Sequence, residues 1–269
     1  AVSSALSEQL PAPIEVVAVN DGSTDGTMEV LRGIDDPRLS VVDLPVNVGR
    51  AQARNIGISQ SRYRYIAILD ADDVVLPGRV GFHWQEFQSD EDLWVSAGQL
   101  VDILPDGSWV RAEYHFPTRQ ELVDREFRLG RMAICHPAAA FRKSWFDWAG
   151  GYDPQLAWCE DFDLFLRGWA PGHFQQGARP LTGYRRRTRI TSWGYWWEND
   201  RYRRAVLARA RDGGQGEPGG KRPIGKYLRS ASSPSAQTRS FAHYCAYRAV
   251  AGLTRGLPWK PTPLELPVQ

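Results

Sequence analysis

Short apolar runs alternate with helical patterns through the first 90 residues of the chain. β-branched and apolar positions predict strands at residues 14–19, 39–44 and 65–69. Between these runs, apolar or small residues recur at helical spacing at residues 28–34 and 47–61. Strands that alternate with helices in this order are typical of a parallel sheet with crossover helices.

The middle and the end of the chain follow other patterns. Residues 94–110 predict two strands joined by a turn at Pro105-Asp106-Gly107, which adds a small antiparallel portion. The glycine-rich segment DGGQGEPGGK predicts a flexible linker at residues 212–221. We therefore expect an α/β domain over residues 1–211, with a Rossmann-like, mostly parallel sheet flanked by helices. A C-terminal extension would follow over residues 222–269.

Composition narrows the class of protein without naming a function. The chain has 269 residues, 42% of them hydrophobic and 24% charged, which is ordinary for a soluble globular protein. Its net charge of +2 argues against a nucleic-acid binder. The 3 cysteines form no CxxC pair, so neither a zinc site nor a disulfide framework is predicted.

Targeting signals are also missing from the sequence pattern. We find no apolar run of about 18 residues and no signal-peptide pattern at the start, so we expect a cytoplasmic protein. The basic and aromatic segment at residues 241–259 leaves two alternatives open. It either rests at the periphery of a membrane surface or docks onto the predicted α/β domain.

The first candidate for chemistry is the acidic segment that follows the strand at residues 65–69. Asp70 and Asp72 are two positions apart at the end of a buried strand, where ligands bind in parallel sheets. Mg²⁺ typically takes one or two protein carboxylates and fills its remaining positions with phosphate oxygens and water. The alternative is a solvated acidic turn, since aspartate is common in turns.

The second candidate is the loop at residues 20–26, NDGSTDG. Its opening matches a calcium-binding loop, but Arg32 occupies the twelfth position, where a glutamate is required, so we reject that interpretation. In one remaining interpretation, Asp21 accepts a hydrogen bond from a nucleotide base or ribose. In the other, the loop is a capped turn between a strand and a helix.

The third candidate is the pair Glu160–Asp161 at a predicted helix start. Adjacent carboxylates there either stabilise the helix dipole or provide a general base for an acceptor hydroxyl. Trp158, just before the pair, either stacks on a sugar or belongs to the core. We interpret His136 as a packed histidine rather than a metal ligand.

Four segments together resemble, in order, the motifs of the family 2 glycosyltransferases of the GT-A fold: residues 14–27, 47–58, 65–80 and 150–167. The resemblance covers roughly residues 5–190. It implies a GT-A-like fold and an inverting transferase with Mg²⁺ or Mn²⁺. The donor would be a nucleotide-diphosphate sugar, often UDP-linked, and the acceptor a hydroxyl of a glycan, lipid or other molecule.

The resemblance also implies roles for individual residues on the donor side. Asp21 would contact the nucleotide base, and Arg54 would lie near the ribose or phosphates. Asp70 would face the ribose or the metal, and Asp72 would be the main metal ligand.

On the acceptor side, the resemblance implies that Asp161 takes the acceptor proton, with Glu160 as the weaker candidate. The attacking oxygen would then displace the diphosphate in line, while the cation stabilises the leaving group.

The sequence departs from the family pattern at three places, one of which is Asn20, where an acidic residue is usual, although Asp21 remains. Family members begin with a further strand ahead of residues 14–19, so this sequence is either truncated at its start or binds its donor differently. A histidine is usual after the strand near Tyr184, where this chain has Arg185 to Arg189, and an arginine there would clamp a diphosphate. Two rival functions stay open: a degenerate, binding-only nucleotide-sugar protein and a nucleotidyltransferase.

Overall fold

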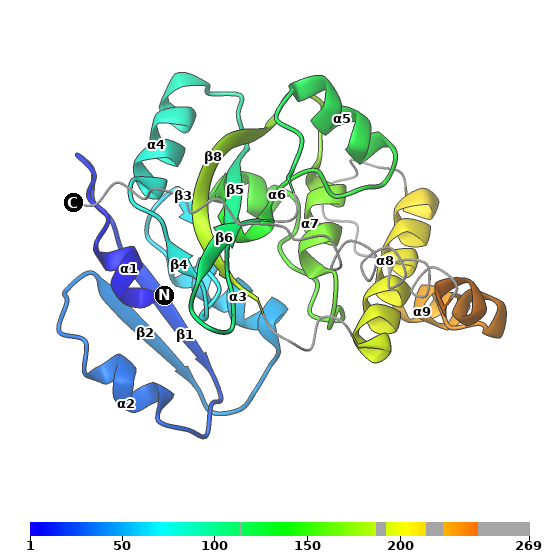
Figure 1. Ribbon diagram of the computed structural model, residues 1–269, viewed down its shortest axis with the longest axis horizontal. Helices are drawn as coiled ribbons and strands as arrows, with labels where there is room; N and C mark the ends of the chain where they lie inside the picture. The colour runs from blue at the N-terminus through cyan, green and yellow to red at the C-terminus, as the bar shows by residue number, and fades with distance from the viewer. Residues whose placement is uncertain (113–114, 187–191, 214–222, 242–269) are drawn as a thin grey trace.

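A computed structural model describes residues 1–112, 115–186, 192–213 and 223–241 of the chain. Its first part is a two-stranded parallel sheet of β1 (Val16–Asp21) and β2 (Leu39–Leu44). The helix α2 (Thr27–Arg32) connects the two strands, and α1 (Val2–Leu6) lies between β1 and β4. Figure 1 shows this small sheet at one end of the molecule, beside the main sheet.

The main sheet contains six strands: β3 (Tyr65–Ala67), β4 (Val74–Val75), β5 (Val95–Ile103), β6 (Trp109–Arg111), β7 (Ala139–Arg142) and β8 (Phe174–Arg185). They are ordered β3-β7-β5-β8-β4, and β6 pairs with β5 outside this path. The β5–β8 pair is parallel, whereas the other pairs of this sheet are antiparallel.

The pairing of β3 differs from the expectation of one parallel sheet through the first strands. β3 pairs antiparallel with β7, with Ile66 opposite Phe141. The sequence pattern did not predict β7, because Ala139, Ala140 and Phe141 are all buried and show no alternation of polar and apolar positions. The antiparallel portion is therefore larger than expected.

Helices cover the main sheet and extend beyond it. They are α3 (Arg50–Gln60), α4 (Arg79–Ser89), α5 (Gln120–Arg128), the 3₁₀ turn η1 (His136–Ala138), α6 (Lys143–Trp148), α7 (Glu160–Gly168), α8 (Trp193–Gly213) and α9 (Gly225–Ala231). Figure 1 shows α8 and α9 together at the end of the molecule away from β1 and β2. None of the helices in the described ranges is long and apolar enough to cross a membrane.

An aromatic core fixes α6 and α7 against the main sheet. The Trp145 and Phe174 rings meet edge to face at 5.4 Å, and Phe165 and Phe174 lie 5.9 Å apart. These side chains are 0–3% exposed, and each contributes about 1.5–3 kcal/mol through burial. The N-terminus of α7, which carries Glu160 and Asp161, is therefore held by a tightly packed support.

Several predicted elements are confirmed. The predicted helices correspond to α2, α3 and α7, and the hairpin β5–β6 turns through Gly107 at a φ of 85°. The division into domains stays a prediction. Ile224 and Tyr227 of the predicted extension lie in the main apolar core, whereas residues 214–222 and 242–269 lie outside the described ranges.

Candidate functional site

The acidic loop after β3 is joined to α3 by a partly buried ion pair. Nη2 of Arg54 donates to Oδ1 of Asp70 at 2.6 Å. Burial alone would raise the pKa of Asp70, but the charge and hydrogen bond of Arg54, with neighbouring positive charges, lower it. Asp70 is therefore a carboxylate at neutral pH.

The same arginine reaches the start of α7. Nη1 of Arg54 donates to Oε1 of Glu160 at 2.7 Å, and Nε of Arg50 lies 2.8 Å from the same oxygen. Glu160 is only 3% exposed. Its pKa is raised by burial and by the adjacent charge of Asp161, against the effect of both arginines. Glu160 thus anchors α3 to α7, which makes it a poor candidate for a general base.

Asp161 has a different environment, although it is the next residue. It is half-buried in the first turn of α7, and its Oδ1 accepts the N–H of Phe162 at 2.8 Å. No cation of the described residues forms an ion pair with its carboxylate. Burial raises the pKa of Tyr152 and of Tyr195, and the charge of Asp161 adds to the shift, which places both phenols within its electrostatic reach. This carboxylate has the exposure that a proton acceptor needs.

Asp21, at the end of β1, holds the entry to α3. Its carboxylate accepts the backbone N–H groups of Val48 at 2.6 Å and Gly49 at 3.1 Å. Gly22 follows at a φ of 65°, and a Cβ there would lie 2.5 Å from the backbone of Asn47. Only glycine therefore fits where the backbone at residue 22 comes this close to the backbone of Asn47. Asp21 belongs to the same corner as Arg54, one helical turn into α3, and its predicted contact with a nucleotide base stays a prediction.

The C-terminal end of β8 is fastened to the acidic loop. Arg185 donates its backbone N–H to Oδ1 of Asp73 at 2.9 Å and its Nε to the carbonyl of Asp72 at 3.0 Å. Burial, with the charges of Asp70 and Asp72, raises the pKa of Asp73 to about 7. Of the predicted arginine cluster, Arg185 therefore lies beside the predicted metal ligands. Residues 187–191 lie outside the described ranges.

A buried polar pair lies beneath Arg54. His136 is packed, as expected, and its Nε2 is hydrogen-bonded to the Tyr152 hydroxyl at 2.8 Å. Burial and the charge of Arg54 lower the pKa of His136 to about 4, so its ring is neutral at neutral pH. The Arg54 guanidinium lies 5.6 Å from the centre of the Tyr152 ring. The sequence pattern did not predict this pair as part of the site, since neither residue belongs to a periodic segment.

The acidic loop has suitable chemistry for a divalent cation. In the described part of the chain, no group of three or more His, Cys, Asp or Glu side chains could enclose a metal. Mg²⁺ and its relatives need only one or two carboxylates when phosphate oxygens complete the coordination. Asp70 and Asp72 follow a strand end and offer hard oxygen ligands, so the residues fit such an ion. Asp70 shares its carboxylate with Arg54, and the role of Asp72 as the main metal ligand stays a prediction.

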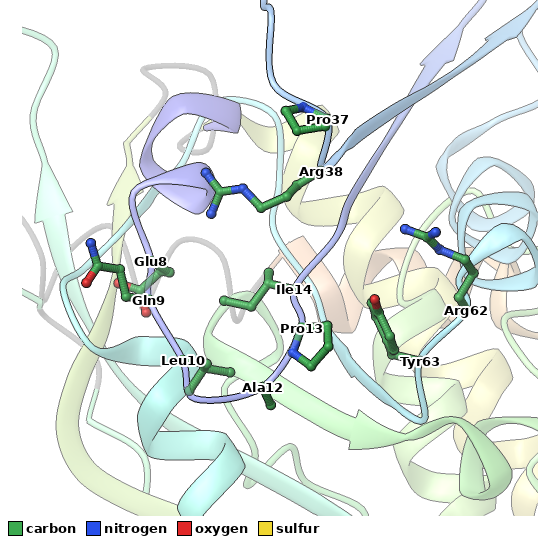
Figure 2. A pocket seen from close by; sticks show the side chains of 10 residues that line it. All are labelled: Glu8, Gln9, Leu10, Ala12, Pro13, Ile14, Pro37, Arg38, Arg62 and Tyr63. Atoms are coloured by element: carbon green, nitrogen blue, oxygen red, sulfur yellow. The ribbon is translucent and has the colours of Figure 1, made fainter.

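A separate cavity lies at the opposite ends of the strands. It has a volume of about 560 Å³ and is lined by residues that precede β1, β2 and β3, among them Ile14, Arg38 and Tyr63. Figure 2 shows these side chains around the opening. The acidic residues follow the C-terminal ends of β1 and β3, so this cavity is not part of the candidate site.

Comparison with known proteins links the chain to a family. The model of the family described as glycosyl transferase family 2 matches residues 1–148. The chain is 31% identical over 176 residues to a chondroitin synthase of Pasteurella multocida, covering 65% of this chain and 18% of that protein. It is 35% identical over 191 residues to the succinoglycan biosynthesis protein ExoU of Rhizobium meliloti, covering 64% of this chain and 53% of that protein. The chain thus spans only part of these relatives.

Solved structures support the fold. Residues 1–349 of TarS from S. aureus match with a TM-score of 0.57 at 17% identity, over 77% of this chain and 60% of that one. The complex of the same protein with UDP-GlcNAc gives a TM-score of 0.58 at 16% identity, over 77% and 61% of the two chains. These neighbours confirm the expected GT-A-like α/β fold. Since the family model covers more than half of its residues, the chain belongs to glycosyl transferase family 2.

Proposed function

We propose that the chain transfers a sugar from a nucleotide-diphosphate sugar to an acceptor hydroxyl, with inversion at the anomeric carbon. One observation carries the proposal: a single guanidinium, that of Arg54, joins the acidic loop to the start of α7. It contacts Asp70 at 2.6 Å and Glu160 at 2.7 Å. In the proposal, the acidic loop binds the cation and Asp161 is the base, and the two lie on either side of the Arg54 ion pairs. A displacement between donor and acceptor requires such an arrangement.

The donor side is formed by the acidic loop. TarS has been solved in complex with UDP and with UDP-GlcNAc, and this likeness supports a UDP-linked donor. Asp72 and Asp70 would hold Mg²⁺ or Mn²⁺, which supplies charge stabilisation for the departing diphosphate. Arg185, hydrogen-bonded to the Asp72 carbonyl, holds the loop in position.

The acceptor side is formed by Asp161. In the proposed reaction, its carboxylate accepts the proton of the acceptor hydroxyl, and the oxygen forms a bond to the anomeric carbon. The bond between that carbon and the diphosphate oxygen breaks, and the nucleoside diphosphate leaves with the electron pair. Arg50 and Arg54 form ion pairs with Glu160 and so compensate its charge. Asp161 therefore has no uncompensated carboxylate at the preceding residue.

The decisive experiment is release of UDP from a panel of UDP-sugars with Mn²⁺ or Mg²⁺, in wild type and in Asp161→Asn. General-base catalysis contributes about 10²–10⁴-fold. We therefore expect Asp161→Asn to lose at least about 100-fold in kcat while UDP binding persists. Asp147→Asn, on the exposed surface of α6, is the matched control and should keep full activity. A wild type that binds UDP but releases none from any donor would identify a binding-only protein.

A further inference from the structure

Three elements meet beside Asp161 at an aromatic corner. Trp158 lies just before α7, and Tyr195 lies in the first turn of α8. The two rings are nearly perpendicular, at 86°, and their centres are 4.9 Å apart. From α3, the Arg50 guanidinium lies 5.6 Å from the centre of the Trp158 ring.

The backbone holds this corner in place. Cys159 adopts a φ of 59°, the only positive φ of a non-glycine residue in the described ranges. This turn separates Trp158, which is half-buried, from Glu160, which is buried beneath the arginines. Sγ of Cys159 donates to the Asn199 carbonyl at 3.5 Å and ties α8 to the start of α7. Strained backbone of this kind persists where the surrounding structure fixes it and is common at ligand sites.

The corner offers polar groups as well as ring surface. Within the described part of the chain, neither the Tyr195 hydroxyl nor the Trp158 indole N–H has a hydrogen-bond partner. Burial raises the pKa of Tyr195, with Asp161 acting in the same direction and Arg50 opposing it, so the phenol lies near the predicted base. The side chain of Arg50 is 51% exposed even though it pairs with Glu160.

We propose that Trp158, Tyr195 and Arg50 form the subsite for the accepting pyranose ring of a saccharide. This inference rests on the proposed function, because the subsite matters only if Asp161 receives the acceptor proton. A pyranose has an apolar C–H face that packs on an aromatic ring and a rim of hydroxyls that needs donors and acceptors. Two perpendicular rings, whose polar atoms have no hydrogen-bond partner among the described residues, and a partly exposed guanidinium meet both requirements.

The test measures acceptor binding separately from donor binding. The probes are the methyl β-glycosides of glucose, galactose, N-acetylglucosamine and glucuronic acid, observed by saturation-transfer NMR with UDP and Mn²⁺ present. At least one glycoside should bind wild type, and Trp158→Ala and Tyr195→Ala should weaken that binding at least tenfold. Tyr195→Phe, which keeps the ring, should weaken it less. Trp148→Ala is the matched control, because Trp148 is 38% exposed on α6 and also pairs with another tryptophan.

The outcomes separate the subsite from the proposed function. UDP binding, measured by calorimetry, should be unchanged in Trp158→Ala and in Tyr195→Phe. If UDP binding and donor turnover are intact but no glycoside binds wild type, or if both alanine variants bind as wild type does, the subsite is overturned and the proposed function stands. If wild type neither binds UDP nor turns over a UDP-sugar, the proposed function fails first.

Discussion

The small β1–β2 sheet and the main sheet are stabilised in different ways. In the main sheet, Val95, Phe141 and Phe174 are 0% exposed, and the apolar core continues into α6 and α7. No hydrophobic side chain of residues 1–50 is fully buried, and the buried side chains there are those of Glu8 and Asn20. Apolar burial therefore stabilises one region and contributes much less to the other.

Polar contacts replace packing in the N-terminal region. The Glu8 carboxylate accepts the N–H groups of Gly78 and Val80 at 2.9 and 2.8 Å, which caps α4. Asp21 does the same for Val48 at the entry to α3. Regions with few buried apolar contacts open at low free energy. The comparison indicates that the corner near Asp21 opens at a lower free energy than the packed support of Asp161.

The largest expected effect comes from removing the ion pair that joins the two carboxylate groups. Arg54 is 18% exposed in its side chain, and Arg54→Ala leaves Asp70 and Glu160 without their shared partner. We expect a loss of about 3–5 kcal/mol of unfolding free energy, together with loss of turnover. Arg62→Ala is the control, since Arg62 is 66% exposed and pairs with Glu15 in the N-terminal region. Arg62→Ala should reduce the free energy of unfolding in urea far less than Arg54→Ala does, because solvent screens an exposed ion pair. Equal losses in the two variants would contradict the comparison.

A matched pair of leucines measures the difference in packing. Leu166, on α7, is 1% exposed, and Leu166→Ala should cost about 2–5 kcal/mol. Leu44, at the end of β2, is only partly buried, so Leu44→Ala should cost about 1 kcal/mol. Urea unfolding followed by circular dichroism gives both values. A larger cost for Leu44→Ala would show that the small sheet has the tighter packing.

The smallest expected effect is a difference in acid sensitivity. The pKa of His136 in the folded state, about 4, is below its ordinary value of 6.5 because of burial and the Arg54 charge, while Asp161 and Asp70 oppose this effect. The folded state resists protonation of His136. The stability that depends on a neutral His136 ring is therefore full above pH 6.5 and is lost as the pH falls toward 4. Between pH 6.5 and 5, wild type should lose roughly 1–2 kcal/mol more than His136→Gln. Parallel pH profiles of thermal unfolding for the two proteins would contradict a lowered pKa of His136 in the folded state.

The sequence predicted the elements that carry the candidate site better than it predicted their contacts. Asp70 and Asp72 do follow a strand, and Glu160 and Asp161 do begin a helix, because both features depend on local patterns. The role of Arg54 as a bridge to Glu160 was not predictable, since the two residues are 106 positions apart. No local pattern encodes such a pairing.

Two further features escaped prediction for physical reasons. The strand β7 is buried on both faces and is short, so it has no alternating pattern. The hydrogen bond between His136 and Tyr152 depends on tertiary packing between η1 and the segment before α7. The antiparallel pairing of β3 was unexpected because β7, its neighbour in the sheet, was not predicted.

The central claim is that the acidic loop and the start of α7 border one nucleotide-sugar site. The most direct measurement is a crystal structure with UDP and Mn²⁺, in which anomalous scattering locates the ion. We predict an Mn²⁺ peak at the Asp72 carboxylate, in contact with the diphosphate. The nucleotide base of UDP should lie on the side of Asp21. UDP bound instead in the cavity beside Arg38 and Tyr63, or an Mn²⁺ peak away from Asp70 and Asp72, would contradict the claim.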